Sequence, residues 1–203
     1  MTCGNCGSAL SQRESGGKPH PWCPSCRTFW NSEKQLTRVH AHRREPPPGS
    51  VVSLVYEPNR TSHDDLVVRV GTWAARSDTY YYTLDPRAGK DGDPVGAIRA
   101  LLKGWRAAVE ACADGEVAWL PHDFSDQYTS WLRCPRDGDA FQIVDGTTGL
   151  EGYTFYPSDF GEAAGRLTDF TPCLYFGEPL RVARRQLLDD IGASLVHLAS
   201  ARS

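Results

Sequence analysis

Two pairs of cysteines near the N-terminus constrain what this chain can fold into more than any other feature. Cys3 and Cys6 form one C-x2-C pair, Cys23 and Cys26 form a second, and 16 residues separate the two pairs. Zinc prefers four tetrahedral ligands, and a two-residue spacer lets one tight turn present two thiolates to the same ion. Two such pairs about 15 to 20 residues apart are typical of a zinc site. The sequence therefore predicts one zinc ion, which is structural because four protein ligands close its coordination shell.

The other readings of these cysteines are a redox dithiol and a disulfide. A thioredoxin-like dithiol belongs to a single C-x2-C beside a βαβ pattern, which this chain lacks. An odd total of seven cysteines favours metal binding in a reducing compartment. We expect Cys112, Cys134 and Cys173 to be buried thiols that act as small hydrophobic groups. With no secretory signal and no apolar run long enough for a membrane span, we expect a cytoplasmic protein.

The cysteine pairs give residues 1–45 a resemblance to the zinc ribbons. The resemblance rests on the two C-x2-C knuckles, and it implies two small hairpins clamped by Zn²⁺. It does not imply one kind of partner, because ribbons occur in nucleic-acid-binding proteins, in multi-subunit machines and as folding staples. Three consecutive prolines followed by Gly49 and Ser50 then predict a stiff linker over 46–50, which separates the ribbon from a domain over 51–203.

The residues after the linker predict an α+β domain with a mostly antiparallel sheet and two main helices. The helix over 94–112 is indicated by apolar residues at i, i+3, i+4 and i+7, and a second main helix opens at 178–179. The expected strands follow one another in groups, which argues against a doubly wound parallel fold. They cover 51–57, 66–74, 79–84, 116–120, 127–133, 140–144 and 152–156; short helices are expected over 33–43 and 158–167, and a strand or irregular segment over 173–176.

Two groups of histidine and aspartate are candidate catalytic or binding sites. His63 is followed by two aspartates in a turn before a strand, and His122 is followed by Asp123, with Asp126 nearby. Either histidine can be held against a carboxylate for acid–base chemistry or for a second metal. The alternative is that turns collect Asp and His because these residues solvate well and cap backbone groups. The usual nucleophile, phosphate-loop and dinucleotide motifs are absent from the sequence.

Aromatic and acidic residues alternate between Trp119 and Phe160, which is the most distinctive stretch of the larger domain. Its composition is similar to that of small uncharacterised bacterial proteins that include immunity proteins of toxin systems. An acidic surface with aromatic side chains suits a basic protein partner, and the alternative is that these aromatics fill the core. The aromatics concerned are Trp119, Phe124, Tyr128, Trp131, Tyr153, Phe155 and Tyr156, and the acids are Asp123, Asp126 and Glu151.

The charge distribution separates three functional hypotheses. Residues 1–49 hold seven Lys or Arg against three Asp or Glu, whereas the whole chain has a net charge of −3, so the larger domain is acidic. We expect first a non-catalytic, zinc-binding interaction or regulatory protein, which neutralises a partner such as a toxin. The second hypothesis is a nucleic-acid-binding accessory factor that uses Lys34, Arg38, Arg43 and Arg44 of the basic ribbon. The third is a small enzyme with an acid–base site near His122 and Asp123.

Overall fold

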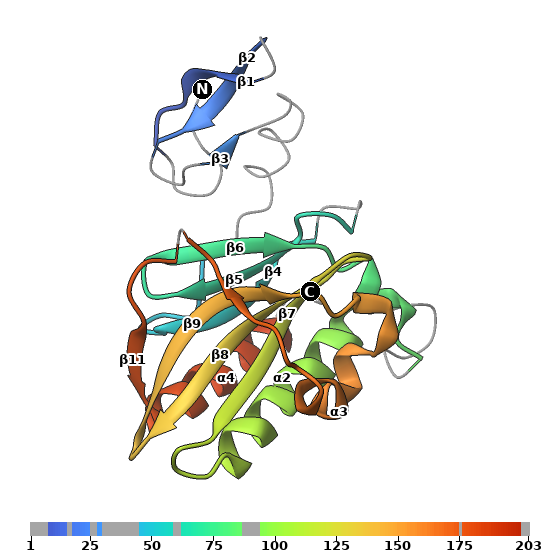
Figure 1. Ribbon diagram of the computed structural model, residues 1–203, viewed down its shortest axis with the longest axis vertical. Helices are drawn as coiled ribbons and strands as arrows, with labels where there is room; N and C mark the ends of the chain where they lie inside the picture. The colour runs from blue at the N-terminus through green and yellow to red at the C-terminus, as the bar shows by residue number, and fades with distance from the viewer. Residues whose placement is uncertain are drawn as a thin grey trace. The chain divides into compact units, whose positions relative to one another are not determined.

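A computed structural model describes residues 8–15, 18–24, 28–29, 45–58, 62–86, 94–174 and 176–199. The chain divides into two compact units, Met1–Arg44 and Glu45–Ser203. We call the second unit the body. It contains both helices and antiparallel sheets, so the expected α+β class is confirmed for this part of the chain (Figure 1).

The first unit contains a small antiparallel sheet in the order β1-β2-β3. Its strands are β1 (Ser11–Ser15), β2 (Lys18–Cys23) and β3 (Thr28–Phe29). Cys23 pairs with Thr28 at the start of the turn between β2 and β3. The helix expected over 33–43 lies outside the described residues.

The body has two antiparallel sheets. One follows the order β4-β5-β6, and the other follows β10-β9-β8-β7, with β11 also paired to β9. The strands are β4 (Val52–Tyr56), β5 (Leu66–Val70), β6 (Trp73–Ser77), β7 (Val117–Phe124), β8 (Thr129–Asp137), β9 (Ala140–Thr148), β10 (Thr171–Pro172) and β11 (Leu180–Ala183).

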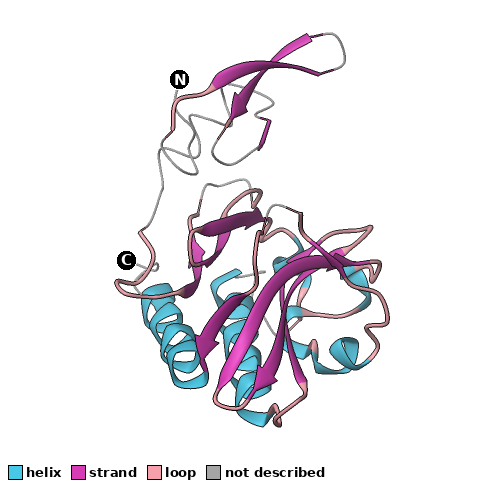
Figure 2. Ribbon diagram, turned by 60° about the vertical axis from the view of Figure 1, so that its left-hand side comes forward, coloured by secondary structure: helices cyan, strands magenta, loops and turns pink. Residues whose placement is uncertain are grey.

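The main helices α2 (Pro94–Ala111) and α4 (Arg184–Ala199) lie on the same side of these sheets (Figures 1 and 2). The short helix α3 (Gly161–Gly165) follows two 3₁₀ turns, η3 (Gly152–Thr154) and η4 (Pro157–Asp159). Helix α2 begins at the proline expected to open it. Its fully buried residues Ile98, Leu101, Leu102 and Trp105 follow the predicted helical period.

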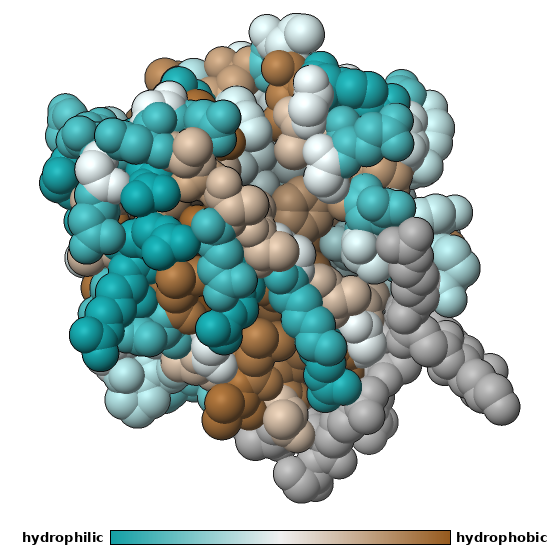
Figure 3. Space-filling model, turned by 90° about the horizontal axis from the view of Figure 1, so that it is seen from below, coloured by the Kyte–Doolittle hydropathy of each residue, from teal (hydrophilic) through white to brown (hydrophobic). Residues whose placement is uncertain are grey.

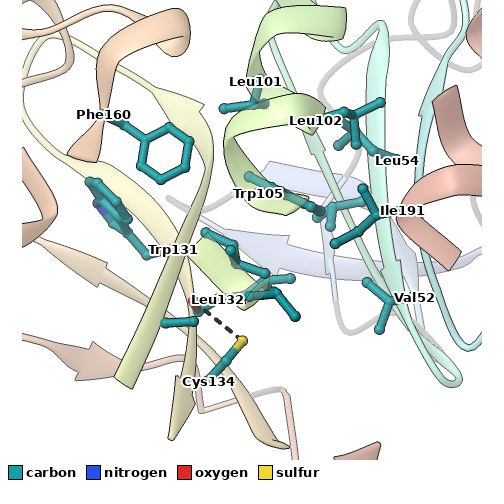
Figure 4. Close-up of a cluster of buried hydrophobic side chains, with 14 of the residues drawn as sticks. Val52, Leu54, Leu101, Leu102, Trp105, Trp131, Leu132, Cys134, Phe160 and Ile191 are labelled. Atoms are coloured by element: carbon teal, nitrogen blue, oxygen red, sulfur yellow. Dashed lines mark hydrogen bonds between the residues drawn. The ribbon is translucent and has the colours of Figure 1, made fainter. Parts of the chain in front are cut away.

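One continuous core joins the helices to both sheets. Figure 4 shows Trp131 and Phe160 facing one another, with Trp105 and Leu54 among the aliphatic residues of the same cluster. Helix α2 packs so closely on Phe160 that a Cβ atom at Gly104 would lie 2.6 Å from the phenyl ring. Gly104 therefore allows a close approach between the helix and the segment that follows β9.

Helix α4 also covers the outer edge of strand β4. The Asp190 carboxylate accepts hydrogen bonds from the N–H groups of Val51 and Val52, at 3.0 and 2.8 Å. The Ser194 hydroxyl oxygen accepts a third, from Leu54 N–H at 3.2 Å. These buried side chains take the place of a neighbouring strand, so the edge offers fewer free N–H groups to another chain.

Several element boundaries differ from the sequence prediction because long-range pairing overrides local preference. The strand expected over 66–74 is a hairpin, since Gly71, with φ of 58°, turns the chain between β5 and β6. The strand expected over 79–84 is wrong, because Tyr81–Leu84 is the 3₁₀ turn η1. The strand expected over 152–156 is wrong for the same kind of reason, since Gly152–Thr154 forms η3. The helix expected from residue 178 begins at Arg184, because Leu180–Ala183 pairs with β9.

Seen from below, the face in Figure 3 carries mostly hydrophilic side chains with hydrophobic areas between them. Such a mixture is ordinary for a folded surface and indicates no site. No helix in the described ranges is long and apolar enough to cross a membrane.

Candidate functional site

The His63 cluster holds a surface turn in place. The Nδ1 atom of His63 lies 2.7 Å from a carboxylate oxygen of Asp78, and the other oxygen accepts the N–H of Asp64 at 2.7 Å. Buried Asp65 accepts hydrogen bonds from the N–H and hydroxyl of Thr79. Burial raises the pKa of Asp65, and its hydrogen bonds to Thr79 oppose this effect. The cluster thus joins the turn before β5 to the segment after β6.

The sequence predicts that the strand ends at residue 120, but His122 lies within strand β7, which continues to Phe124. The pairing of β7 with β8 shifts between Pro121 and Asp123, which is the irregularity of a β-bulge at His122. The carbonyl oxygens of the bulge accept hydrogen bonds from side chains: Trp105 Nε1–H donates to Pro121 at 2.9 Å. The Ser77 and Tyr82 hydroxyls donate to the His122 carbonyl, at 2.8 and 3.0 Å.

The imidazole of His122 is buried against a carboxylate that the sequence analysis did not find. Its Nε2 lies 2.7 Å from Oδ1 of Asp145 in strand β9, and the two side chains are 3 and 7 % exposed. Trp73 packs against the imidazole in an edge-to-face arrangement at 6.3 Å. Because so little of the ring is exposed, His122 is badly placed to take a proton from a substrate that arrives from solvent.

Asp123 follows the bulge and is the most perturbed acid near this pair. Burial raises its pKa from 3.8 to about 6; the charge of His122 opposes the rise, and the carboxylates of Asp78 and Asp145 add to it. Ionised Asp123 is therefore held where its charge is poorly solvated and close to other negative charges. Strongly perturbed acids of this kind are candidates for functional residues.

Asp123 belongs to a larger group of acids and tyrosines that three separate segments bring together. We call this group the acidic tyrosine surface. It comprises Asp78, Tyr80 and Tyr81 after β6, Asp123, Asp126 and Tyr128 around the β7–β8 loop, and Glu151 and Tyr153 after β9.

Electrostatic coupling shows that these segments are neighbours. Partial burial raises the pKa of Tyr128, and the charges of Asp123 and Asp78 raise it further. Desolvation likewise raises the pKa of Tyr81, together with a hydrogen bond to Asp126 and that carboxylate's charge. For Tyr153 the leading cause of the raised pKa is its hydrogen bond to Glu151. The surface thus combines phenol and carboxylate groups.

Hydrogen bonds and one glycine fix the arrangement of the loops. The Ser125 hydroxyl and N–H both bond to the Tyr128 carbonyl, at 2.9 and 3.0 Å, which closes the β7–β8 loop. The Gly152 N–H donates to the Ser125 carbonyl at 2.7 Å. A Cβ atom at Gly152 would lie 2.7 Å from the Phe124 backbone carbonyl carbon, so a glycine is needed for this contact.

The aromatics of the 119–160 stretch divide between the two expected roles. Phe124, Trp131 and Phe155 are buried in the core. Tyr128, Tyr153 and Tyr156 are 43, 61 and 43 % exposed. Trp119 is half-buried against Phe170, with ring centroids 5.3 Å apart. The core role is confirmed for the buried aromatics, and the interface role stays a prediction for the exposed tyrosines.

Asp78, Tyr80 and Tyr81 are site residues that the sequence did not predict. Their signal was the run of tyrosines after an aspartate, which β propensity assigned to a strand. The sequence did not predict Asp145 either, because nothing local links this residue to His122. Tyr80, at 48 % exposure, adds another exposed phenol to the surface.

The predicted zinc ligands are only partly within the described residues. Cys23 is fully buried at the end of β2, and Cys3, Cys6 and Cys26 lie outside the described ranges. The same is true of the predicted nucleic-acid contacts Lys34, Arg38, Arg43 and Arg44. The residues that are described contain no group of three or more His, Cys, Asp or Glu suited to a metal ion.

The remaining cysteines follow expectation except for one. Cys112 and Cys134 are buried, and burial raises the pKa of both thiols, which keeps them protonated and unreactive. Cys173, expected to be buried, is half-buried, because it lies in the irregular stretch after β10 where its N–H bonds to the Asp145 carbonyl at 2.8 Å.

Comparisons of the chain with protein-family models, with curated proteins and with solved structures found no match.

Proposed function

We propose that this protein is a non-catalytic interaction protein whose body binds a basic protein partner through the acidic tyrosine surface. The observation that carries the proposal is the convergence of four carboxylates with exposed tyrosines from three separate segments. A basic toxin that the body neutralises is the partner class that this surface and the composition of the 119–160 stretch favour.

The chemistry of the surface suits such a partner. Tyrosine is enriched among the residues that carry most of the energy of interfaces, because its ring buries area and its hydroxyl keeps a hydrogen bond. Carboxylates around these rings attract a basic surface over a distance of about one Debye length and set its orientation. The acidic excess of the body, in a chain of net charge −3, acts in the same direction.

In the ribbon, we propose that Cys3, Cys6, Cys23 and Cys26 hold one Zn²⁺. The proposal is supported by Cys23, whose thiol is buried where β2 ends, and by the backbone pairing of Cys23 with Thr28 between β2 and β3. A C-x2-C pair can present both of its thiolates to one ion. Bound zinc would supply folding free energy to a sheet with few large apolar side chains.

The test uses the full chain and a lysine- and arginine-rich peptide, with the same peptide carrying glutamate at each cationic position as its control. Reversing two exposed charges together, Asp126→Lys and Glu151→Lys, should weaken binding of the basic peptide at least about tenfold in fluorescence anisotropy. Reversing Asp139 and Asp189, which are exposed elsewhere on the body, changes the net charge equally and serves as the matched control. Equal losses in both double variants would attribute the binding to net charge and refute the proposal.

One observation favours an enzyme as a second candidate. Asp123 has a pKa raised to about 6, largely by burial, and it lies beside the Tyr128 phenol, so it is suited to exchange a proton near neutral pH. Buried His122 would then position the strand rather than act as the base. A substrate turned over by the wild-type chain and lost in Asp123→Asn, with peptide binding intact, would favour this candidate.

A further inference from the structure

The turn that carries His63 has an unfavourable backbone conformation on both sides of this residue. Ser62 and Asp64 have φ of 57° and 53°, and they are the two non-glycine residues with positive φ among those that the structure describes. This left-handed region is unfavourable for residues that have a Cβ atom. The turn is held by the Asp64 N–H, which donates to Asp78 at 2.7 Å, and by the Tyr80 N–H, which donates to the Ser62 carbonyl at 3.0 Å. Such conformations persist where the surrounding structure enforces them, so the His63 imidazole is presented in a fixed place.

The His63 imidazole contacts two members of the acidic tyrosine surface directly. Its Nδ1 lies 2.7 Å from the Asp78 carboxylate. Its ring stacks on that of Tyr80, with centroids 5.9 Å apart and planes inclined by 20°. Tyr80 in turn packs edge-to-face on Tyr81, with centroids 5.2 Å apart. The His63 side chain is 59 % exposed, so solvent can exchange a proton with it.

Protonation of His63 changes what this part of the surface offers to a partner. Histidine is the side chain whose charge ordinarily changes between about pH 5 and pH 8. In the neutral ring, Nδ1–H donates to Asp78, and the carboxylate keeps its net negative charge. The protonated ring instead forms an ion pair with Asp78 and lies as a cation over the face of Tyr80. A carboxylate and a tyrosine ring are the groups that would otherwise receive a cation of the partner.

We infer that His63 makes the acidic tyrosine surface sensitive to pH, because its imidazolium occupies Asp78 and Tyr80 and weakens the binding of a basic partner below about pH 6. The inference rests on the proposed function, since it describes the regulation of the same surface. The sign follows from charge, because the protonated ring adds a positive charge where the partner brings its own. Binding of the proton and binding of the partner therefore oppose one another, and each lowers the affinity for the other.

The charged groups around His63 act in the same direction or do not titrate. Arg76 of β6 keeps its charge at every relevant pH, and it is paired with Glu57 in a largely buried ion pair. Partial burial raises the pKa of Asp64, and the charge of Asp78 raises it further, so acid also neutralises this carboxyl. The remaining neighbours, in the same turn and after β6, are Asp65, Asp78 and Tyr80.

The test measures binding of the lysine- and arginine-rich peptide to the full chain by fluorescence anisotropy, at about pH 7.5 and about pH 5.5 and at constant ionic strength. The wild type should bind more weakly at the lower pH. His63→Gln should lose at least about threefold less affinity over this interval, because glutamine can donate to Asp78 but gains no charge. Burial raises the pKa of Asp123 to about 6, and this carboxyl titrates in both proteins, so its contribution cancels in the comparison.

A permanent charge at the same position should have the opposite effect. His63→Arg places a cation that keeps its proton beside Asp78 and Tyr80, so it should bind the peptide at least about threefold more weakly than the wild type at pH 7.5. Gln142→Arg adds the same charge at an exposed position of β9 and should bind as the wild type does. Equal pH dependence of the wild type and His63→Gln, or wild-type affinity of His63→Arg at pH 7.5, would overturn the inference.

The same measurements separate this regulation from the proposed function. If the peptide binds at pH 7.5 through Asp126 and Glu151, but the wild type and His63→Gln lose the same affinity on acidification, His63 does not regulate the surface and the interaction surface stands. If the peptide does not bind at pH 7.5, the proposed function is wrong and the regulation by His63 is wrong with it.

Discussion

Replacing Asp123 with asparagine should stabilise the body, and the gain should depend on pH. The pKa of Asp123 is raised by burial from 3.8 to about 6 in the folded protein. The folded state thus holds this proton more tightly than the unfolded chain does. The contribution of Asp123 to the free energy of unfolding is highest below pH 4. It falls as the pH rises from the unfolded to the folded pKa, and it is constant at higher pH.

The size of the effect follows from the width of that interval. Each pKa unit corresponds to about 1.4 kcal/mol, so the ionised carboxylate destabilises the fold by at most about 3 kcal/mol above pH 6. Asparagine has nearly the same shape, carries no charge and keeps an oxygen that accepts a hydrogen bond. We expect Asp123→Asn to be more stable than the wild type by about 1–3 kcal/mol at pH 8 and nearly equal to it at pH 4.

Urea unfolding followed by tryptophan fluorescence measures this difference, because buried Trp105 and Trp131 report on the body. Comparing variant with wild type at each pH removes the contributions of other titrating groups, among them Asp64 and Asp65, whose pKa values burial also raises. Exposed Asp139→Asn is the control and should show little difference at any pH. A gain that stays the same from pH 4 to pH 8, or a loss of stability at pH 8, would refute the reasoning.

Three further predictions test the scaffold and the ribbon. Asp190→Ala removes the acceptor of two N–H groups on the edge of β4 and should lower the free energy of unfolding in urea by about 2–4 kcal/mol. Exposed Asp189→Ala is the control and should lower it by less than about 1 kcal/mol. Equal losses would contradict the role of Asp190 in covering this edge. Gly152→Ala places a Cβ atom 2.7 Å from the backbone of β7, so it should lower the free energy of unfolding by about 1–3 kcal/mol and weaken peptide binding. Gly161→Ala is the control and should change neither, because a Cβ atom there meets open space. Elemental analysis should find one zinc ion per chain. Both chelation of the zinc and the Cys23→Ser variant should reduce the β signal in circular dichroism. A metal-free chain with an unchanged spectrum would exclude the zinc site.

The sequence predicted elements whose signal is local and repeated. Helix α2 has 18 residues, long enough for several turns of apolar residues to define one buried face. The conformation of the shorter elements depends on contacts with residues that are distant in the sequence. Thr79 is held by Asp65 from the turn before β5, and the chain after it coils into η1 instead of extending. Residues 180–183 form strand β11 because they pair with β9, and their own sequence does not predict this pairing.

The candidate site was predicted less well than the fold for the same reason. His122 and Asp123 were identified because they adjoin in sequence, but Asp145 is 23 residues away and is brought to His122 by the pairing of β7, β8 and β9. Asp78 follows Ser77, whose hydroxyl donates to the His122 carbonyl from the other sheet. Such contacts cannot be predicted from a single sequence, because they depend on the register in which distant strands pair.

His122 and Asp123 lie where the two sheets of the body meet. Strands β6 and β7 belong to different sheets, and the described hydrogen bond between them is made by a side chain, that of Ser77. A bulge at this junction turns His122 toward Asp145 and leaves Asp123 partly exposed. A buried imidazole nitrogen with no hydrogen-bond partner among the described residues and an ionised carboxyl with a raised pKa both lower stability, and they belong to the adjacent residues His122 and Asp123. Proteins tend to keep such local costs where function needs them.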